Sequence, residues 1–380
     1  MTNQKEKRKE PELRFPEFSG EWEEKDLSSI IDVNSGKDYK HLNRGDIPVY
    51  GTGGLMLYVD EKLSDRDGVG IGRKGSINKP QLLKAPYWTV DTLFYCIPKI
   101  NNDLYYIYTL YQKINWLKYD ESTGVPSLSK ATINKIKQYF PEYKEQQKIG
   151  EFFSKLDRQI ELEEKKLALL EEQKKGYMQK IFSQELRFKD ENGEEYPEWD
   201  KCRLEEICTL TMGFTPSTKN EEFWNGDLPW LSIAGMNSKY TSNGSKNISE
   251  IAIKNKKIVK KGTLLMSFKL SIGNLTILKE DMYTNEAICH FNWNNNSILN
   301  EFVYYYLKTI DIKSYGSRAA KGITLNSENL NSILIEKPAI KEQNKIANML
   351  SKLDEKIEKQ KLKLLNCNKR KTELLRKVLI

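Results

Sequence analysis

The sequence predicts a mixed α+β protein in which two similar domains are separated by an antiparallel pair of long helices. Three observations predict this fold class. They are a repeat at an offset of 197 residues, a heptad pattern in each repeated segment, and a glycine-rich region with short β-prone runs in each half. The 380 residues also exceed what one ordinary core organises, since single domains usually end at roughly 100 to 200 residues.

The repeat is clearest where each helical segment begins. Residues 145–149 (Glu-Gln-Gln-Lys-Ile) recur as residues 342–346 (Glu-Gln-Asn-Lys-Ile), and Ser-Lys-Leu-Asp follows in both copies, at 154–157 and 351–354. A proline precedes each copy at the same distance, Pro141 and Pro338, where it ends the preceding segment and allows a helix to begin. Each half also opens alike, with Glu-Leu-Arg-Phe at 12–15 and again at 185–188.

These anchors divide the chain into five parts, because the segments between them match only in patches. The predicted parts are a flexible N-terminal tail (1–11), a first domain (12–141), a first long helix (142–183), a second domain (184–338) and a second long helix (339–380).

Both helical segments carry a heptad of apolar residues, alternating four and three apart as a coiled-coil seam requires. The predicted packing positions are Ile149, Phe153, Leu156, Ile160 and Leu167 in the first helix and Ile346, Leu350, Leu353, Ile357 and Leu364 in the second. Polar residues interrupt both seams at the same two places, Glu163 and Gln360, and Lys174 and Lys371. Each segment of about 35 residues predicts a helix on the order of 50 Å long. Because the first helix leads into the second domain, the second must return antiparallel, which predicts an approximate internal twofold relation.

A glycine-rich segment in the first domain, residues 68–76, reads as an exposed loop tipped by Arg73 and Lys74 and followed by Ser76. Backbone amides in such a loop can approach phosphate. It is neither a dinucleotide fingerprint nor a Walker loop, because the third glycine and a Gly-Lys-Ser/Thr ending are missing. Residues 267–274 are its counterpart, with Lys269 and Ser271. The alternative is a hairpin whose basic tips face water.

A second polar loop precedes each long helix. Residues 120–127 include Thr123, and residues 315–322 include Arg318 and Lys321. Arginine and lysine in such loops are candidates for contacts with phosphate or guanine. The tyrosines at 105, 106, 108 and 111 and at 304–306 lie in apolar runs with helical character, so we expect them in cores rather than stacked on bases.

The net charge of +8 is concentrated in one segment. Residues 341–380 hold twelve Lys/Arg against five Asp/Glu, a surplus of seven. The two domains are therefore close to neutral, and any surface for nucleic acid must be a local asymmetry. The basic helix has three possible explanations: a solvated face, an acidic partner surface or DNA backbone.

Several functional classes are disfavoured by composition. Five scattered cysteines without a Cys-x-x-Cys spacing signal neither a disulfide framework nor a zinc cluster. The presence of only two histidines, His41 and His290, argues against a His-rich metal site or a catalytic triad. Neither a run of ~18 apolar residues nor an apolar leader is present in the sequence, which predicts a cytoplasmic protein with no membrane contact.

Taken together, the motifs resemble the specificity subunits of type I restriction-modification systems. The resemblance spans essentially the whole chain and rests on order: Leu-Arg-Phe-Pro16 before Trp22, Lys-Glu-Gln-x-Lys-Ile after Pro141 or Pro338, and Ser-Lys-Leu-Asp before a heptad. It implies that each domain is a target recognition domain that reads one half of a bipartite double-stranded DNA site, and that the helices set the gap. From it we expect DNA contacts at Arg73, Lys74, Ser76, Thr123, Lys269, Ser271, Arg318 and Lys321.

The resemblance also implies partners and a division of chemistry. Two modification subunits, which bind S-adenosylmethionine and methylate adenine, and restriction subunits, which use ATP and Mg, are expected to join this chain. The chain itself is then expected to be non-catalytic and to bind no cofactor. It lacks an Asn-Pro-Pro-Tyr methylation motif and a Pro-Asp pair that would start a restriction-nuclease signature. Two alternatives stay open: a coiled-coil scaffold that reads no DNA, and a nucleic-acid enzyme.

Overall fold

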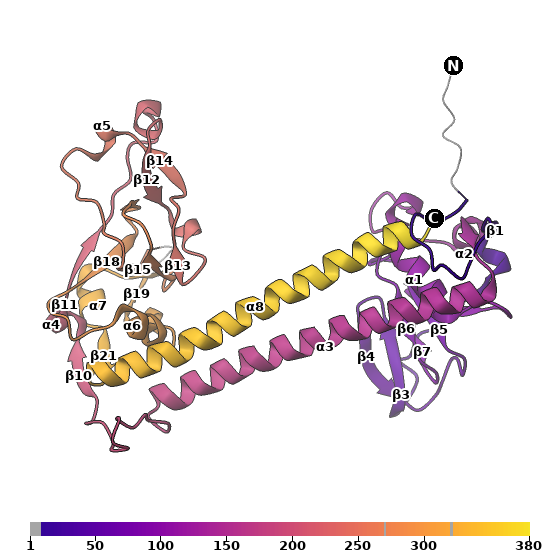
Figure 1. The fold of residues 1–380 in the computed structure, drawn as a ribbon, viewed down its shortest axis with the longest axis horizontal. Coiled ribbons are helices and arrows are strands. Elements are labelled where there is room, and N and C mark those ends of the chain that lie inside the picture. The colour runs from indigo at the N-terminus through magenta and orange to yellow at the C-terminus, as the bar shows by residue number, and fades with distance from the viewer. Residues whose placement is uncertain (1–8, 270, 320–321) are drawn as a thin grey trace. The chain divides into compact units, whose positions relative to one another are not determined.

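The computed structural model describes residues 9–269, 271–319 and 322–380, and the chain divides into two compact units. Unit 1 comprises residues 1–166 and 360–380, and unit 2 comprises residues 167–359. Each unit therefore contains one globular domain and one half of each long helix (Figure 1). The predicted mixed α+β fold class is confirmed, since both domains combine strands with helices.

The domain of unit 1 is built on two main sheets. A four-stranded antiparallel sheet has the order β2-β8-β5-β6, and a three-stranded sheet has the order β4-β3-β7, with β3 and β7 parallel. A two-stranded sheet, β1-β9, joins the two ends of the domain. The strands are β1 (Glu23–Asp26), β2 (Ile31–Ser35), β3 (Arg44–Gly51), β4 (Gly54–Val59), β5 (Gly68–Gly72), β6 (Gln81–Leu83), β7 (Trp88–Thr89), β8 (Leu93–Pro98) and β9 (Lys137–Phe140); the helices are η1 (Leu27–Ser29), α1 (Leu104–Lys113), η2 (Trp116–Tyr119) and α2 (Lys130–Lys135).

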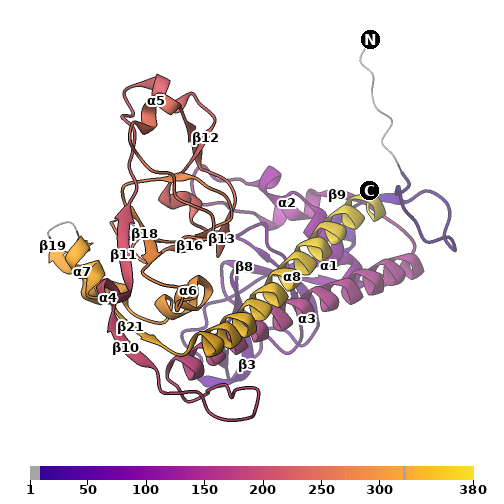
Figure 2. The ribbon, with the colours of Figure 1, turned by 60° about the vertical axis from the view of Figure 1, so that its left-hand side comes forward.

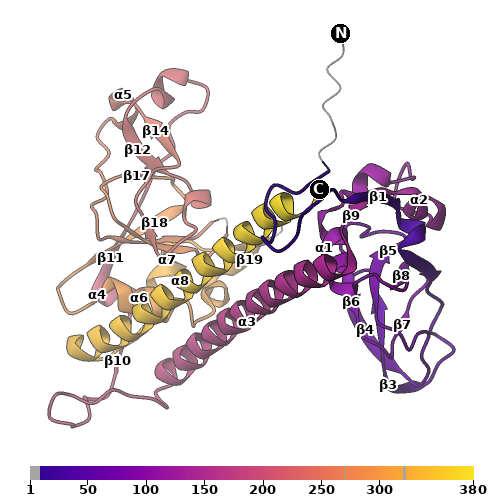
Figure 3. The ribbon, with the colours of Figure 1, turned by 45° about the vertical axis from the view of Figure 1, so that its right-hand side comes forward.

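Helix α1 forms the centre of the core of unit 1. Asp103 caps its N-terminus by accepting a hydrogen bond from the Tyr106 amide, which satisfies one of the free N–H groups of the first turn. Its side chains Tyr106 and Tyr111 are fully buried, and they share one cluster with strand residues such as Ile71 and with Phe153 of the first long helix. Figure 3 shows α1 beside the first long helix. Helix α1 therefore links the sheet to the long helices.

The prediction of an exposed glycine loop over residues 68–76 is wrong for its first five residues. Gly68–Gly72 forms β5, an interior strand of the four-stranded sheet, and every residue in it is buried. The glycines serve close packing: a Cβ on Gly70 would lie 3.2 Å from Leu83, and one on Gly72 only 2.3 Å from the Ser76 carbonyl oxygen. Only residues 73–76 emerge as a loop.

Unit 2 repeats this plan. Its larger sheet has the order β11-β18-β15-β16-β13, and its smaller sheet has the order β14-β12-β17, again with one parallel pair in the smaller sheet. The strands are β10 (Asp200–Arg203), β11 (Cys208–Met212), β12 (Leu228–Leu231), β13 (Tyr240–Thr241), β14 (Lys246–Ile248), β15 (Leu264–Ser267), β16 (Leu275–Leu278), β17 (Tyr283–Thr284), β18 (Ile288–Trp293), β19 (Ser317–Ala319), β20 (Gly322–Thr324) and β21 (Leu334–Lys337). The helices are α4 (Leu204–Ile207), η3 (Glu221–Trp224), η4 (Ile233–Gly235), α5 (Glu250–Ile253), α6 (Asn300–Leu307), η5 (Ile312–Tyr315) and α7 (Ser327–Asn331).

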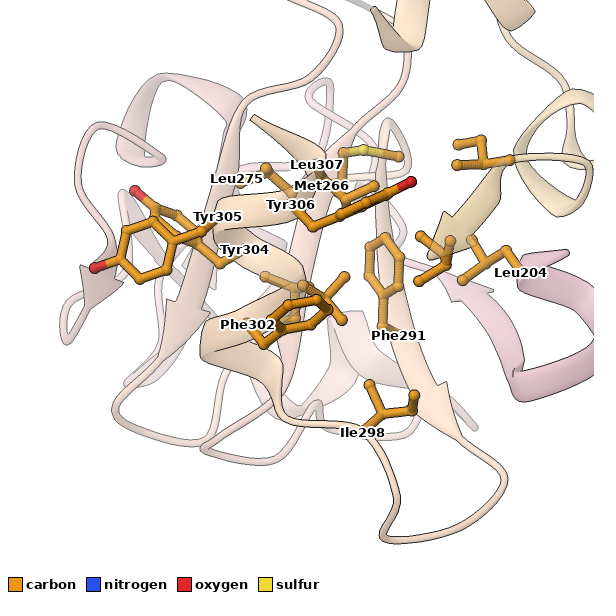
Figure 4. Packing of buried hydrophobic residues seen from close by; sticks show 14 of the residues in the cluster. Leu204, Met266, Leu275, Phe291, Ile298, Phe302, Tyr304, Tyr305, Tyr306 and Leu307 are labelled. Atoms are coloured by element: carbon orange, nitrogen blue, oxygen red, sulfur yellow. The ribbon is translucent and has the colours of Figure 1, made fainter. Parts of the chain in front are cut away.

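Helix α6 has the place in unit 2 that α1 has in unit 1. Tyr304, Tyr305 and Tyr306 are all buried, as predicted. Figure 4 shows Tyr306 directed toward the side of Leu204, whereas the rings of Tyr304 and Tyr305 point the opposite way. The matched tryptophans complete the similarity: Trp22 packs edge-on against Tyr106 at 6.3 Å between ring centroids, and Trp199 packs against Phe302 at 5.8 Å. The two domains thus use the same core plan with different residues.

The long helices are α3 (Tyr143–Phe182, 40 residues) and α8 (Ile340–Val378, 39 residues). Within unit 1, Asp157 pairs with Lys371 and Glu163 pairs with Gln360. The residue number of the partner in α8 therefore decreases as the residue number in α3 increases. This order is that of antiparallel helices, as predicted. In unit 2, Lys174 of α3 pairs with Asp354 of α8. Asp157 corresponds to Asp354 in the repeat, and Lys174 corresponds to Lys371. Each unit therefore has an equivalent Asp–Lys pair between the helices, with the aspartate on α3 in unit 1 and on α8 in unit 2.

Candidate nucleic-acid interface

The loop after β5 carries the predicted basic residues of unit 1. Arg73 and Lys74 are exposed and Ser76 is half-buried. The backbone amides of Arg73 and Lys74 donate to the Thr92 carbonyl oxygen at 2.8 and 3.3 Å, and the Arg73 guanidinium lies 5.9 Å from the centre of the Phe94 ring. The loop backbone is therefore fixed, while both basic side chains remain accessible to a ligand.

The second predicted loop of unit 1 lies directly beside the first. Lys74 forms a β-bridge with Ser127, and the Gly75 amide donates to the Pro126 carbonyl oxygen at 2.8 Å. Asp120 organises this loop, because one of its carboxylate oxygens accepts hydrogen bonds from the Ser127 and Ser122 amides at 2.8 and 3.0 Å. These bonds, led by that from Ser127, lower the pKa of Asp120. Thr123 is exposed in this loop. The structure thus brings the loops of all four candidates of the first domain together.

In unit 2 the corresponding loop follows β15, which has the same place in its sheet as β5. The Ser267 hydroxyl closes a tight turn by donating to the Ser271 carbonyl oxygen and accepting from the Asn274 amide. Ser271 has a φ of 48°, a backbone conformation that few non-glycine residues adopt. Lys269 and Ser271 are both exposed. The remaining candidates are not brought into this turn by any described contact: Arg318 lies in β19, and Lys321 lies outside the described residues.

Sequence reasoning missed a cavity in unit 1. It has a volume of about 860 Å³ and lies between the segment before β3 and the hairpin of β3 and β4. Its lining includes Tyr39, Lys40, Asn43, Arg44 and Tyr58. The mixture of basic and aromatic residues at positions 39–44 was the signal that could have identified it, since such mixtures suit nucleic-acid binding.

The predicted seam residues lie partly in the domain cores. Ile149, Phe153 and Leu156 belong to the core of unit 1, and Ile346, Leu350 and Leu353 belong to that of unit 2. Ile160 and Ile357 are buried, whereas Leu167 and Leu364 are half-buried. The first turns of the heptad therefore also attach each domain to a long helix.

A buried ion pair reinforces this attachment in each unit. Arg14 donates through two nitrogens to the Glu145 carboxylate at 2.8 and 2.7 Å, and Arg187 does the same to Glu342 at 3.3 and 2.8 Å. Both glutamates are almost completely buried, at 1% and 0% exposure. The bond to its glutamate is the largest cause that raises the pKa of each arginine. The first residues of each domain are thus fixed to the long helix that follows that domain in the sequence, α3 in unit 1 and α8 in unit 2.

A neighbouring glutamine makes an equally matched contact. Gln146 donates to the Pro141 carbonyl oxygen and accepts from the Asp103 amide, at 3.0 and 3.1 Å. Gln343 donates to the Pro338 carbonyl oxygen and accepts from the Leu299 amide, both at 2.9 Å. In both units the side chain joins the start of the long helix to the start of α1 or α6. The repeated Glu-Gln motif is therefore a structural joint.

Unit 2 has a further polar joint that the sequence did not reveal. The Tyr305 hydroxyl donates to the Asp354 carboxylate, and the Lys239 ammonium donates to Tyr305 at 3.0 Å and to Ser351 at 2.7 Å. Burial is the largest cause that lowers the pKa of Lys239. Because Asp354 also pairs with Lys174, one network connects α3, α8 and the second domain.

Buried titratable groups outside these contacts include cysteines and a histidine. All five cysteines are free, and burial raises the pKa of Cys96, Cys208 and Cys289 to about 12. His290 lies between the Thr211 and Thr284 hydroxyls, at 3.0 and 2.6 Å, and burial lowers its pKa to about 4. In the part of the chain that the structure describes, no group of three His, Cys, Asp or Glu side chains is placed to hold a metal ion. Among the same residues, no helix has the length and apolar character needed to cross a membrane.

Comparison with known proteins agrees with the predicted resemblance. The chain is 33% identical over 189 residues to the type I restriction enzyme MjaIX specificity subunit of Methanocaldococcus jannaschii, a match that covers 47% of this chain and 44% of that protein. It is 27% identical over 297 residues to the MjaVIII specificity subunit of the same organism, covering 70% and 69%. The chain thus matches less than half the length of the first of these relatives.

A solved structure extends the comparison to the whole fold. The S subunit of a type I restriction-modification system from M. genitalium superimposes with a TM-score of 0.66 and 16% sequence identity, covering 98% of this chain and 99% of that one. The family model for the type I restriction modification DNA specificity domain matches twice, at residues 19–172 and 196–366. Because these two matches together cover most of the sequence, the chain belongs to the family of type I restriction modification DNA specificity domains.

Proposed function

We propose that this chain is the subunit of a type I restriction-modification complex that recognises double-stranded DNA, with each domain reading one half of a bipartite site. One observation carries the proposal: the specificity-domain model matches both halves, and the four strands of the larger sheet in the first domain have counterparts in the same order in the second, which adds β13 at the edge. Two domains of similar fold suit a DNA site that consists of two half-sites. Each domain also presents an exposed basic loop after an equivalent strand, β5 in the first domain and β15 in the second. Side chains of these loops can reach phosphates and base edges.

The long helices are proposed to set the gap between the half-sites and to dock two modification subunits. Exposed leucines support docking on the helix pair of unit 1, since Leu162 of α3 and Leu362 and Leu365 of α8 are each about half exposed. Apolar side chains on an otherwise polar helix surface favour a protein partner. Restriction subunits complete the proposed assembly.

Catalysis is assigned to those partners. S-adenosylmethionine is proposed to bind the modification subunits, and ATP and Mg the restriction subunits, while this chain binds no cofactor and acts in the cytoplasm. The thiols of Cys96, Cys208 and Cys289 and the His290 ring are buried, which makes them poor nucleophiles or proton carriers.

A domain exchange tests the proposal. The chain is produced with its modification subunits, and methylated sites are mapped by long-read sequencing. Replacing residues 12–141 with the first domain of a relative of different specificity is expected to change one half-site and preserve the other. Unchanged methylation sites would instead favour the scaffold alternative, in which the coiled coil joins enzymes without reading DNA.

A further inference from the structure

The connection between β14 and β15 in unit 2, residues 249–263, carries a dense group of lysines. It contains Lys254, Lys256, Lys257, Lys260 and Lys261 and a single acidic residue, Glu250, a surplus of four positive charges. All five lysines are exposed. Helix α5 lies in this connection, and Figures 1 and 2 both show α5 at the end of unit 2 away from the parts of α3 and α8 that belong to this unit. The basic group is therefore separate from the helices.

The corresponding connection of unit 1 has the opposite charge. Strands β4 and β5 have the places in their sheets that β14 and β15 have in unit 2, and residues 60–67 connect them. This segment holds four acidic residues, Asp60, Glu61, Asp65 and Asp67, against two basic ones, Lys62 and Arg66. A basic connection is thus no requirement of the fold, and the lysines of unit 2 need another explanation.

The lysine segment is held in place on both sides. Ile253 and Ile258 pack against the cluster of Trp230, Ile248 and Tyr283. Val259 and Met282 exchange two backbone hydrogen bonds of 3.0 Å, and Asp281 accepts from the Lys261 amide and the Lys260 ammonium at 2.8 Å. A fixed backbone lowers the entropy cost of binding a ligand through the side chains.

Most of the positive charge is left available. Lys260 is paired with Asp281, and the charge of Lys261 also acts on this carboxylate, whereas within the described residues Lys254 and Lys257 form no ion pair. Lys256 lies 5.7 Å from the centre of the Phe214 ring, and nearby Lys246 lies 5.0 Å from that of Trp224. Repeated unpaired ammonium groups on a rigid surface suit a ligand with repeated negative charges.

We propose that the β14–β15 connection binds the phosphate backbone of double-stranded DNA, so that the second domain contributes more of the non-specific affinity than the first. This inference rests on the proposed function and adds a contact that carries no sequence information. Each lysine that neutralises a phosphate releases a counterion, which makes binding steeply dependent on salt.

The test uses the complete complex of this chain with its modification subunits. Binding is measured over a series of salt concentrations with two duplexes of equal length. One carries the site mapped by methylation sequencing and the other is scrambled. The triple variant Lys254→Gln, Lys256→Gln and Lys257→Gln is expected to reduce the slope of log affinity against log salt by about 2 to 3, at about 0.9 per phosphate contact. The loss should be equal on both duplexes, leaving their affinity ratio unchanged.

Matched variants separate the possible outcomes. Lys62→Gln in the acidic connection of unit 1 removes one lysine and should leave the slope unchanged, whereas Lys257→Gln alone should reduce it by about 0.9. An unchanged slope in the triple variant overturns the inference, and so does loss of the modification subunits in size-exclusion chromatography, which would assign the lysines to an acidic protein surface. If the wild-type complex itself methylates no defined site, it is the proposed function that fails.

Discussion

The side-chain amide of Gln360 donates a 2.7 Å hydrogen bond to the carboxylate of Glu163, and the two residues are 197 positions apart, the offset of the internal repeat. Each is therefore the repeat counterpart of the other. Glu163 also accepts from Lys363, and the bond from Gln360 is the largest cause that lowers its pKa. The polar positions that interrupt both heptads are thus contact points between the helices, and they fix the register in which α3 and α8 meet.

The reciprocal ion pairs allow this register to be tested. Asp157→Lys places two ammonium groups together in unit 1, and we expect it to lower the free energy of unfolding by about 1 to 2 kcal/mol, because the Asp157–Lys371 pair is mostly buried. Adding Lys371→Asp restores an opposite pair and should recover most of the loss. A double-mutant cycle by chemical denaturation measures the coupling. Strictly additive effects would show that the pair does not hold the register.

The two buried arginine–glutamate ion pairs should contribute about equally to the stability of their own units. Arg14→Ala leaves the buried Glu145 carboxylate without its cation, and Arg187→Ala does the same to Glu342. Each change is expected to cost about 3 to 5 kcal/mol, the usual range for breaking a buried pair. Hydrogen exchange should show each loss in its own unit. Arg158→Ala, at an exposed pair with Glu161, is the control and should cost less than about 1 kcal/mol.

Acid should destabilise unit 2 through His290. Its pKa is about 4 in the folded chain against an ordinary value of 6.5, so between these values the unfolded chain binds a proton that the folded chain does not. The contribution is fully present above pH 6.5 and is lost as the pH falls toward 4. We expect about 2 kcal/mol less stability at pH 5 than at pH 7 from this residue. His290→Asn should remove that part of the pH dependence in denaturant titrations; an identical profile would contradict the assignment.

The candidate loops make a separate prediction about DNA binding. Alanine at Arg73, Lys74, Lys269 or Arg318 should weaken binding in gel shifts by about 1 to 3 kcal/mol where the side chain contacts a base, with the complex with the modification subunits preserved. Alanine at Lys118, an exposed lysine just before the 120–127 loop, serves as the comparison. Equal affinity for all variants, or dissociation of the complex, would reject these residues as DNA contacts.

What the sequence could predict depended on how far apart the interacting residues lie. The long helices and the buried tyrosines follow from local periodicity, and the repeat identified the matched anchors. The burial of Gly68–Gly72 did not follow, because glycines typical of a loop also permit a strand to pack closely against Leu83 and Tyr87. The contacts of Asp354 with Lys174 and Tyr305 did not follow either, since they join segments distant in sequence. The lysines of residues 254–261 were visible as composition, but their significance required the comparison with the acidic connection of unit 1.

The proposed role of the helices predicts a change in spacing without a change in reading. One heptad is added to each long helix near its middle, between Glu163 and Lys174 in α3 and between Gln360 and Lys371 in α8. A full heptad preserves the side of the helix that carries the seam and adds about 10 Å of length. At ~3.4 Å per base pair, the unread gap should increase by about 3 base pairs. Methylation mapping should then find the same two half-sites at a wider spacing. As a control, insertion of the heptad in α3 alone shifts its seam against α8 and should reduce assembly. New half-site sequences in the double insertion would show that the helices take part in base recognition, which the spacer model excludes.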